Sequence, residues 1–371
     1  MARAWAEIDL GAVRENVRTL RRVAAPARFC AVVKANGYGH GAAAVAWAAV
    51  DAGADWLAVA QVDEAVALRD AGIDAPVLLL SEPRADEVDD AVAAGVRLSV
   101  YTSTCLAAIA KSVRAMRAPA VPLHLKVETG MNRVGAAPAD VVPLARAIRD
   151  LTEVHLEGVF THCPVADEPG NPFTADQLVR FDALLDELRA AGIDPGIVHA
   201  ANSAGTIVHP GARRDLVRCG IAVYGIPPAP ALAGMVELRP ALTLASEVSF
   251  VKRVAAGEGI SYGHRHRVAE PTTIATVPIG YADGVFRALP LYGQEVLVGG
   301  RRRPMVGVVT MDHLMVDCGP DADVQAGDPV VLLGRQGDEH IAPDEWAARL
   351  GTIGYEVVCA IGARVERRYR K

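Results

Sequence analysis

The feature that most constrains the fold of this chain is an alternation between short apolar runs and longer, Ala-rich amphipathic stretches over its first two thirds. The apolar runs read as strands at residues 29–35, 56–60, 76–80, 96–101, 122–128, 155–162, 197–202 and 216–221. Several of the amphipathic stretches end in Gly, which is a frequent helix stop. Eight such strand–helix units predict a closed parallel (β/α)8 barrel of the TIM type. An open doubly wound sheet is the alternative, but no GxGxxG follows a strand.

The texture of the chain changes after about residue 238. Short β-like segments follow one another at close spacing and are separated by Gly, Pro and Asp, which is typical of antiparallel sheets. A last amphipathic stretch at 343–351 predicts a helix. A length of 371 residues also favours two domains over one. We therefore predict a barrel over residues 1–238 and an antiparallel, mostly-β domain over residues 239–371.

Composition excludes several classes of partner. A net charge of −6 with a pI near 5.9 disfavours nucleic acids and anionic membranes. The N-terminus lacks the apolar core of a signal peptide, and no segment resembles a membrane span. The cysteines are scattered, without a CxxC pair, at Cys30, Cys105, Cys163, Cys219, Cys318 and Cys359. We expect a reduced cytoplasmic protein that binds neither nucleic acid nor membrane and holds no structural metal.

Lys34 is the most informative single residue, because it follows an apolar strand in the run AVVKANGYGHG. The chain uses only five lysines among its 38 basic residues, so a lysine here suggests a role that arginine cannot fill. A buried lysine can lose its proton and act as a nucleophilic amine, whereas arginine does not. A Schiff base with a carbonyl cofactor is the natural use. The alternative is a lysine that snorkels at a strand end.

Other polar residues fall at the carboxyl ends of the predicted strands, where barrel enzymes carry their chemistry. They are Arg133, His162, Asn202, Ser203, Arg218, Gly220 and Ile221. Backbone N–H groups and a hydroxyl near the ends of strands 7 and 8 commonly bind phosphate in this fold, and Ser203 with Gly205 and Gly220 with Ile221 fit that description. Structural alternatives stay open: a helix N-cap for Ser203, an ion pair inside the barrel for Arg218, and a buried structural role for His162.

Lys126 lies in the run LHLKVE, whose alternation places it on one face with His124 and Glu128. That polar face is expected to point into the barrel, which would bury Lys126. A buried ammonium is costly unless it is paired or neutralised. One interpretation is an ion pair with Glu128 or another interior acid. The other is a carbamylated lysine whose negative charge orients Arg133.

With these residues in place, the chain resembles the alanine racemase family, fold-type III enzymes of pyridoxal 5'-phosphate. The resemblance covers essentially the whole length. The motifs that carry it occur in family order: WAEIDL, AVVKANGYGHG, KVETGMNRVG, FTHCPVADE, HAANSAG, VRCGIAVYG, SYG, IGYADG, VGVVTMDHLMVD, GRQGD and YEVVC.

The resemblance implies a role for each matching position. Lys34 would carry the cofactor and serve as one base, and Tyr262 would be the second base on the opposite face. Because tyrosine has an unperturbed pKa near ~10, His162 and Arg218 would form the hydrogen-bond chain that tunes it. Arg218 would face the pyridine nitrogen. The positions implied to hold the cofactor are Lys34, Tyr38, His162, Asn202, Ser203, Arg218, Gly220, Ile221 and Tyr355.

The resemblance also implies the substrate site and an assembly. Arg133 and the backbone of Met311 would bind the substrate carboxylate, while Tyr281 and Asp312 would line the entrance. In the family the β domain of a partner subunit completes the site, so a head-to-tail homodimer is expected. The implied activity is the interconversion of L-alanine and D-alanine, which supplies D-alanine for bacterial peptidoglycan. A broader racemase acting on alanine and serine is the alternative.

The chain departs from the family pattern at two places, and three other classes of barrel protein fit its motifs less well. Asn132 stands where the family often has Gly, and Cys163–Val165 replaces an aromatic and small residues. A non-catalytic pyridoxal phosphate-binding barrel usually lacks the second domain. A related decarboxylase typically needs a Cys donor from its β domain, and the SYG and TMDHLMVD segments favour the racemase. A metal-dependent barrel hydrolase with a carbamylated Lys126 is disfavoured, because this chain has no His-x-His after strand 1.

Overall fold

The computed structural model describes residues 3–371 and divides the chain into two compact units. One unit, the barrel unit, comprises Ala12–Gly37 and Ala42–Arg239. The other, the β unit, takes the chain up to Gly11 together with Tyr38–Gly41 and Pro240–Lys371. The division differs from the expected boundary at residue 238, because two N-terminal segments join the C-terminal part of the chain.

The barrel unit contains eight parallel strands within the described residues. They are β2 (Arg28–Val32), β3 (Trp56–Val59), β4 (Val77–Leu79), β5 (Arg97–Val100), β6 (Val121–Lys126), β7 (Val154–Phe160), β8 (Ile197–His199) and β9 (Leu216–Cys219). Their order is β8-β7-β6-β5-β4-β3-β2-β9. The terminal strands β8 and β9 approach through Asp215 N–H, which donates to Val198 O at 3.0 Å, and Arg218 N–H, which donates to Ala201 O at 2.9 Å. The predicted barrel is confirmed, with one loosely joined seam.

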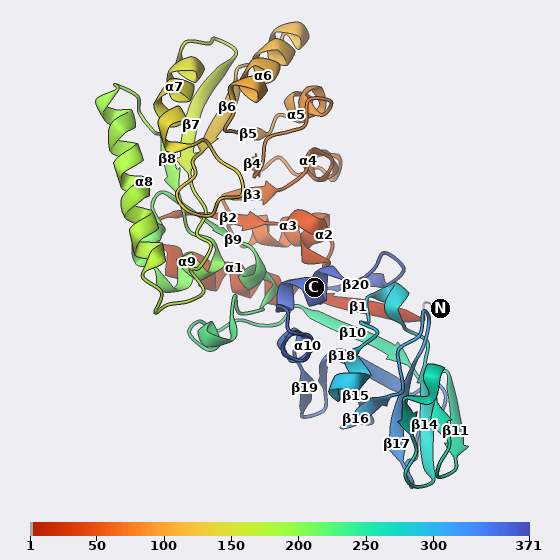
Figure 1. Ribbon diagram of the computed structural model, residues 1–371. Coiled ribbons are helices and arrows are strands. Elements are labelled where there is room, and N and C mark those ends of the chain that lie inside the picture. The colour runs from red at the N-terminus through yellow and green to blue at the C-terminus, as the bar shows by residue number, and fades with distance from the viewer. Residues whose placement is uncertain (1–2) are drawn as a thin grey trace. The chain divides into compact units, whose positions relative to one another are not determined.

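Helices follow the strands and lie outside them (Figure 1). They are α1 (Leu10–Ala24), α3 (Ala42–Asp51), α4 (Val62–Asp70), α5 (Val88–Ala93), α6 (Ser103–Met116), α7 (Pro138–Arg149), α8 (Phe173–Ala190) and α9 (Ser203–Val208). Strand residues such as Leu57, Ala58 and Val59 are all fully buried. Continuous apolar runs suit these strands because both of their faces are covered. Within residues 3–371, no helix has the length and apolarity needed to cross a bilayer.

The strands end earlier than their apolar runs predict. β2 stops at Val32, β8 at His199 and β9 at Cys219, whereas the runs extend to residues 35, 202 and 221. At these points the chain leaves the sheet and forms loops at the carboxyl ends of the barrel strands, here called the strand-end rim. Lys34 therefore opens a turn beyond β2 and is not the last residue of a strand.

The β unit is built on a mostly antiparallel sheet, as predicted. In the described chain its order is β11-β14-β17-β16-β15-β18-β10-β1-β20, with β19 paired to β18 and a separate β12–β13 pair. The strands are β1 (Ala4–Asp9), β10 (Leu242–Glu247), β11 (Phe250–Val254), β12 (Gly259–Ile260), β13 (His266–Arg267), β14 (Thr272–Val277), β15 (Glu295–Val298), β16 (Arg301–Val306), β17 (Leu314–Gly319), β18 (Pro329–Gln336), β19 (Glu339–Ile341) and β20 (Glu366–Arg370). The helices are α10 (Pro343–Leu350) and α11 (Gly354–Cys359).

β1 explains why the domain boundary differs from the expected one. It pairs antiparallel with β10, with Ala6 opposite Leu244, and parallel with β20, with Ala6 opposite Arg367. Its side chains alternate between buried and half-buried, which suits a strand in the interior of a sheet. The backbone hydrogen bonds of β1 are therefore made in the β unit, although the barrel unit follows it in sequence.

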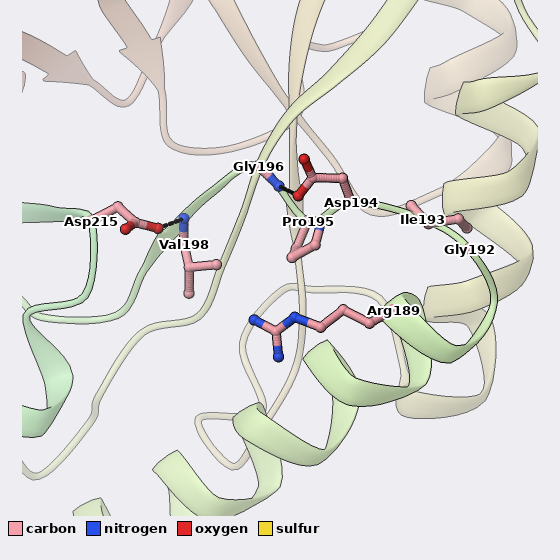
Figure 2. A pocket seen from close by; sticks show the side chains of 8 residues that line it. All are labelled: Arg189, Gly192, Ile193, Asp194, Pro195, Gly196, Val198 and Asp215. Atoms are coloured by element: carbon pink, nitrogen blue, oxygen red, sulfur yellow. Dashed lines mark hydrogen bonds between the residues drawn. The ribbon is translucent and has the colours of Figure 1, made fainter.

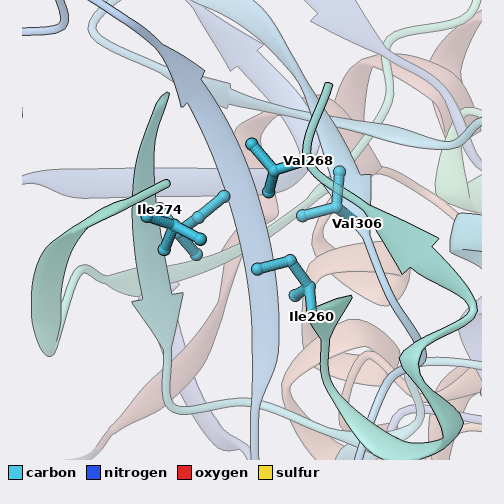
Figure 3. Close-up of a cluster of buried hydrophobic side chains, with 5 residues drawn as sticks. Ile260, Val268, Ile274 and Val306 are labelled. Atoms are coloured by element: carbon cyan, nitrogen blue, oxygen red, sulfur yellow. The ribbon is translucent and has the colours of Figure 1, made fainter. Parts of the chain in front are cut away.

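A small apolar cluster in the β unit supports one of the predicted site residues. Val254, Ile260, Val268, Ile274 and Val306 are buried together (Figure 3), and Met315 packs against them. Ile260 ends β12, and the next two residues are Ser261 and Tyr262. The cluster thus anchors the backbone from which Tyr262 projects.

Candidate active site

The Lys34 side chain is presented by a left-handed turn. After Val33 the chain enters α2 (Lys34–Tyr38), in which Ala35, Asn36, Gly37 and Tyr38 have φ of 52°, 51°, 61° and 49°. Left-handed backbone costs roughly 1–2 kcal/mol for each residue other than Gly, so the surroundings must hold this turn. The Gly37 N–H donates to Val33 O at 2.9 Å, and Asn36 Oδ1 accepts from the Ala42 N–H at 3.0 Å. Only one of the four left-handed positions is a glycine.

Glu64, on α4, holds this turn from outside, and no motif of the sequence assigns it to the site. Its Oε1 accepts from the Ala35 N–H at 2.5 Å, and its Oε2 accepts from Ala60 N–H at 2.9 Å and Gln61 N–H at 3.1 Å. An acid three residues after a helix N-cap is a recognisable capping signal. The sequence could have indicated the two contacts at the start of α4, but the contact with Ala35 depends on the tertiary structure.

The predicted residues of the barrel rim come together as a cationic cluster. Burial first, and then the charges of Arg218, Arg133, Lys126 and Lys34, hold the pKa of His162 well below its usual value. Because these four charges all act on His162, the four basic groups lie within electrostatic range of its ring. The five side chains belong to four strands or to the loops that follow them, and the charges of the four basic groups act on His162.

Lys126 points into the barrel, as its alternation predicts, and is 5% exposed. Burial lowers its pKa from 10.5 to about 8, with further lowering by Arg133, Arg218 and Lys34 against the opposing effect of Glu128. Its Nζ lies 5.6 Å from the Phe160 ring centre. In residues 3–371, no carboxylate forms an ion pair with this ammonium, so the ion-pair interpretation is not supported.

Glu128 accepts hydrogen bonds from the backbone of the following loop and does not form an ion pair with Lys126. Its Oε1 accepts from the Gly130 N–H at 2.5 Å. Burial raises the pKa of this carboxyl, but hydrogen bonds from the backbone of residues 130–133 lower it by more, so that the net direction is downward. The carboxylate thus organises the loop that carries the exposed Arg133.

Arg218 is 3% exposed and is surrounded by neutral acceptors. Its Nη1 donates to His199 Nδ1 at 2.8 Å, and its Nη2 donates to the Thr161 and Ala200 carbonyls at 2.8 and 3.0 Å. His162 Nδ1 lies 3.3 Å from Nη2. Burial lowers the pKa of Arg218 to about 10. No acid of the described chain touches this guanidinium, so its charge is not a barrel-layer ion pair.

The contact with Arg218 fixes the hydrogen-bonding state of His162. A guanidinium has donors only, so His162 Nδ1 must accept and its proton must lie on Nε2. Gln177 Nε2 donates to His162 O at 2.8 Å and to Thr129 Oγ1 at 2.8 Å. Thr129 Oγ1 and Thr161 Oγ1 are 2.6 Å apart. This buried polar cluster steadies the His162 backbone, and no sequence motif pointed to Thr129 or Gln177.

The ends of β8 and β9 meet through the Ser203 hydroxyl. Ser203 Oγ accepts from the Gly220 N–H at 2.9 Å and from the Ala222 N–H at 3.4 Å. The N-cap of α9 is Asn202, whose Oδ1 accepts from the Gly205 N–H at 2.9 Å, so Ser203 is not the cap. Asn202 Nδ2 also donates to Cys163 O at 3.1 Å. Its side chain therefore serves the local structure, while the hydroxyl and N–H groups sit together as expected of a phosphate site.

Tyr38 and Tyr355, predicted to bind phosphate, belong to the β unit. Their rings lie 6.2 Å apart at 54°, and Tyr38 is buried. Gly39, just after Tyr38, has φ of 80°, and a Cβ there would lie 2.3 Å from Val358 O. The close approach of this glycine to α11 brings the two tyrosines together.

Tyr262 projects from a strained loop and is 73% exposed. Ser261 has φ 60° and ψ −172°, a region that is nearly restricted to glycine. Its hydroxyl donates to Val308 O at 2.8 Å. Strain of this kind persists only where the surroundings over-determine it, which here means that hydrogen bond and the apolar cluster under Ile260.

Met311 and Tyr281 are also exposed, at 53% and 43%. The Ala282 N–H donates to Met311 O at 3.1 Å, and the Tyr281 N–H donates to Thr310 O at 3.0 Å. Arg364 bridges the acids of the same region, with Nη2 2.7 Å from Asp312 and Nε 3.1 Å from Asp283. The three predicted residues thus lie on one well-held part of the β unit.

A separate cavity of about 400 Å³ lies at the amino end of β8, opposite the strand-end rim (Figure 2). The carboxylate of Asp194 accepts from the Gly196 N–H at 3.0 Å, and that of Asp215 accepts from the Val198 N–H at 2.8 Å. Arg189 pairs with Asp186 at 2.8 Å. The charged groups that line this cavity are therefore occupied by local contacts. In (β/α)8 barrels the active site lies at the opposite, carboxyl ends of the strands.

A (β/α)8 barrel with basic residues at the ends of its strands, joined to a mostly-β unit, has the architecture of an enzyme whose site lies at the strand ends. Two family profiles match the chain: "Alanine racemase, N-terminal domain" at residues 8–228 and "Alanine racemase, C-terminal domain" at residues 241–369. The chain belongs to the alanine racemase family.

Curated relatives and solved structures agree with this assignment. The alanine racemase of Symbiobacterium thermophilum is 51% identical over 100% of this chain and 97% of the relative. That of Frankia casuarinae is 44% identical over 99% and 96%. Alanine racemase from D-cycloserine-producing Streptomyces lavendulae superposes with a TM-score of 0.94 at 40% identity, covering 100% and 98%. The Bacillus anthracis enzyme with bound L-Ala-P gives 0.93 at 38%, covering 100% and 96%.

Proposed function

We propose that this protein interconverts L-alanine and D-alanine with pyridoxal 5'-phosphate as its cofactor. The proposal rests on the contact of Arg218 Nη2 with His162 Nδ1 at 3.3 Å and on the charges of Lys34, Lys126 and Arg133, which act on the same histidine. A cluster of cations without an acid in contact with Arg218 suits an anionic cofactor and the carboxylate of an amino acid. The lysine amine among them supplies the group that such a cofactor requires.

The residues present fit this cofactor. Lys34 would hold it covalently, and Arg218, supported by His162, would face its ring nitrogen. The phosphate would be held by Tyr38, Ser203, Gly220, Ile221 and Tyr355, with Asn202 shaping the loop beneath. When bound, the cofactor supplies an electron sink that makes the Cα–H bond of the substrate acidic. Since Arg218 holds its proton firmly, it would donate a hydrogen bond to the ring nitrogen without protonating it.

Inversion at Cα requires two bases, because one base tends to return the proton to the face from which it came. Lys34 would take or give the proton on one face, and Tyr262 would do so on the other. The His162 Nε2–H, fixed by the contact with Arg218, would donate a hydrogen bond to the phenol oxygen and stabilise its anionic form. Both residues would act as general acid and general base in turn.

The substrate carboxylate would be bound by Arg133 and the backbone of Met311, with Tyr281 and Asp312 at the entrance. Lys126, as a carbamate, would carry a negative charge that orients Arg133. The lowered pKa of Lys126, about 8, favours this modification because the neutral amine is the form that reacts with carbon dioxide.

A head-to-tail homodimer would complete each site, with Tyr262, Tyr281, Met311 and Asp312 supplied by the partner. The exposure of the large side chains Tyr262, Tyr281 and Met311 supports this assembly, since an interface with a second subunit would cover them. We propose further that the enzyme acts in the cytoplasm and supplies D-alanine for peptidoglycan.

A racemisation assay tests the proposal. The purified protein, loaded with pyridoxal 5'-phosphate, is incubated with L-alanine, D-alanine, L-serine and a few larger amino acids, and both enantiomers are separated by chiral chromatography. We expect both enantiomers of alanine to appear from either one. Comparable rates on serine would favour the broader racemase, and no inversion of any amino acid would contradict the proposal.

A further inference from the structure

A buried chain of hydrogen bonds runs through the barrel from Arg218 to an acid on β7. Arg218 Nη1 lies 2.8 Å from His199 Nδ1, and His199 Nε2 lies 2.8 Å from His124 Nδ1. His124 Nε2 lies 3.1 Å from Glu157 Oε2. His124 and His199 are fully buried, so neither ring has water as an alternative partner.

The backbone is shaped to accommodate this chain. The β6–β7 register passes from Leu123 opposite Leu156 to His124 opposite Gly158, which leaves Glu157 as the extra residue of a β-bulge. A Cβ on Gly158 would lie 2.7 Å from His124 Nδ1 and 2.5 Å from Ile197 O. Gly158 therefore leaves space for the imidazole, and the bulge aims the Glu157 carboxylate at it.

Aromatic rings hold the two imidazoles in place. Phe160 stacks on His199 with ring centres 4.7 Å apart and planes 5° from parallel. The Arg218 guanidinium lies over the Phe160 ring, 5.2 Å from its centre. Trp56 meets His124 edge-on at 5.4 Å and carries Arg97 on its face at 5.3 Å. These contacts limit ring rotation, so the chain has one geometry.

The chemistry of the two ends decides where every proton lies. Arginine can only donate, so His199 Nδ1 accepts and its proton sits on Nε2. That proton points at His124 Nδ1, which must accept, so the His124 proton also sits on Nε2 and points at Glu157. A carboxylate can only accept, so the acid requires the same arrangement as the arginine does. A second proton on either imidazole would set one N–H against another.

We propose that Glu157 and His124 are positioning residues that fix His199 as a permanent acceptor for Arg218 and so orient its guanidinium at the strand-end site. Burial lowers the pKa of His124, and burial with the charge of Arg218 holds that of His199 well below its usual value. Both rings are accordingly neutral. Arg97 Nε, 3.4 Å from the same Glu157 oxygen, keeps that acid ionised as the fixed end of the chain.

The first test reads the protons directly and needs no cofactor. Neutron diffraction, or long-range ¹H–¹⁵N spectra of the histidine-labelled apoprotein, should show a single proton on Nε2 of both His124 and His199. A proton on Nδ1 of either ring, or a doubly protonated His124, would overturn the inference. This outcome is independent of racemase activity, so it separates the inference from the proposed function.

The second test, which rests on the proposed function, compares two substitutions at one position. His124→Gln can still accept from His199 through its oxygen and donate to Glu157 through its nitrogen, whereas His124→Leu can do neither. We expect His124→Leu to weaken cofactor binding by about tenfold and to shift the absorbance of the bound cofactor, because a hydrogen bond to a charged group is lost from its support. His124→Gln should stay within about threefold of the wild-type protein.

Glu153→Gln provides the matched control. Glu153 immediately precedes β7 and pairs with Arg114 at 2.8 Å, but it lies outside the chain of imidazoles. It should leave the cofactor dissociation constant and absorbance unchanged. Equal cofactor dissociation constants and absorbance spectra for His124→Leu and His124→Gln would show that the chain of hydrogen bonds does not position Arg218. If His124→Leu does not fold, the proton positions in the wild-type protein still decide the matter.

Discussion

The Glu64 carboxylate accepts a hydrogen bond from the Ala35 N–H, the backbone group that directly follows Lys34. The same carboxylate accepts from Ala60 and Gln61, at the end of the neighbouring strand. One acid on α4 thus joins the left-handed turn after β2 to the loop after β3. The position of the Lys34 amine depends on a residue thirty positions away in sequence.

Replacing Glu64 tests how much this acid contributes. Glu64→Gln keeps one acceptor oxygen and removes the charge, so we expect a loss of about 1–2 kcal/mol in the free energy of unfolding. Urea denaturation of the apoprotein measures it. Asp70→Asn, an exposed change at the other end of the same helix, is the control and should be within ~0.5 kcal/mol of wild type. Equal stabilities of the two variants would show that the turn does not need Glu64.

Removing the Lys34 amine tests the proposed link to the cofactor. Lys34→Ala and Lys34→Arg should both lose the absorbance of the covalently held cofactor and lower racemase activity by about a thousandfold or more, because neither side chain can form the link. Lys111→Ala, on the exposed face of α6, should keep both properties. An unchanged spectrum in Lys34→Ala would refute the Schiff-base assignment.

Tyr262→Phe tests the assignment of the two faces. Loss of one base should slow removal of the Cα proton from L-alanine by about 10²–10³-fold and affect D-alanine far less, because Lys34 remains on the other face. Exchange of the Cα proton with deuterated solvent, followed separately for each enantiomer, measures the asymmetry. Equal loss in both directions would defeat the two-base scheme.

Mixing two inactive variants tests whether a site is shared between subunits. In a dimer of Lys34→Ala with Tyr262→Phe, a shared arrangement leaves one of the two sites with both bases intact. Random exchange of subunits should then restore about a quarter of the wild-type activity, since half of the dimers are mixed. Each variant refolded alone serves as the baseline. No recovery after subunit exchange has been verified would mean that both bases come from one chain.

The free amine and the carbamate of Lys126 predict different pH dependences for the free energy of unfolding. With a free amine, its pKa is about 8 in the folded protein against 10.5 when unfolded, so the unfolded chain holds more protons between these values. Stability then rises with pH, by about 1.5 kcal/mol from pH 8 to 9.5, and Lys126→Met removes this rise. A carbamate does not titrate as an ammonium and gives no such rise. Urea denaturation in degassed and in bicarbonate-containing buffer separates the two states.

Much of the fold could be predicted from local patterns. Each barrel strand was found because β2 to β9 are short apolar runs, and runs of this kind are buried on both faces of a parallel sheet. The inward direction of Lys126 followed from simple alternation. The predicted strands are too long at their carboxyl ends, because Val33, Ala200 and Gly220, which follow Val32, His199 and Cys219, are still apolar or small although their backbone has left the sheet.

The candidate site was predicted unevenly. Lys34, His162, Ser203 and Arg218 could be proposed from the sequence because each lies at or just after the carboxyl end of a predicted strand. The sequence did not indicate Glu64, Thr129, Glu157, Gln177 and His199, because their hydrogen bonds are made with residues distant in sequence. Asn202 stays a predicted cofactor residue; in the structure its Oδ1 caps α9 and its Nδ2 donates to Cys163 O.

The sequence by itself determined the class of fold, the family and the residue types at the strand ends, because apolar periodicity and motif order are local properties of the chain. The tertiary structure alone decided three other things. It placed β1 in the sheet of the β unit, held Lys34 on a left-handed turn, and set two buried imidazoles between Arg218 and Glu157. Each depends on hydrogen bonds between distant residues, whose donors and acceptors acquire partners only when the chain has folded.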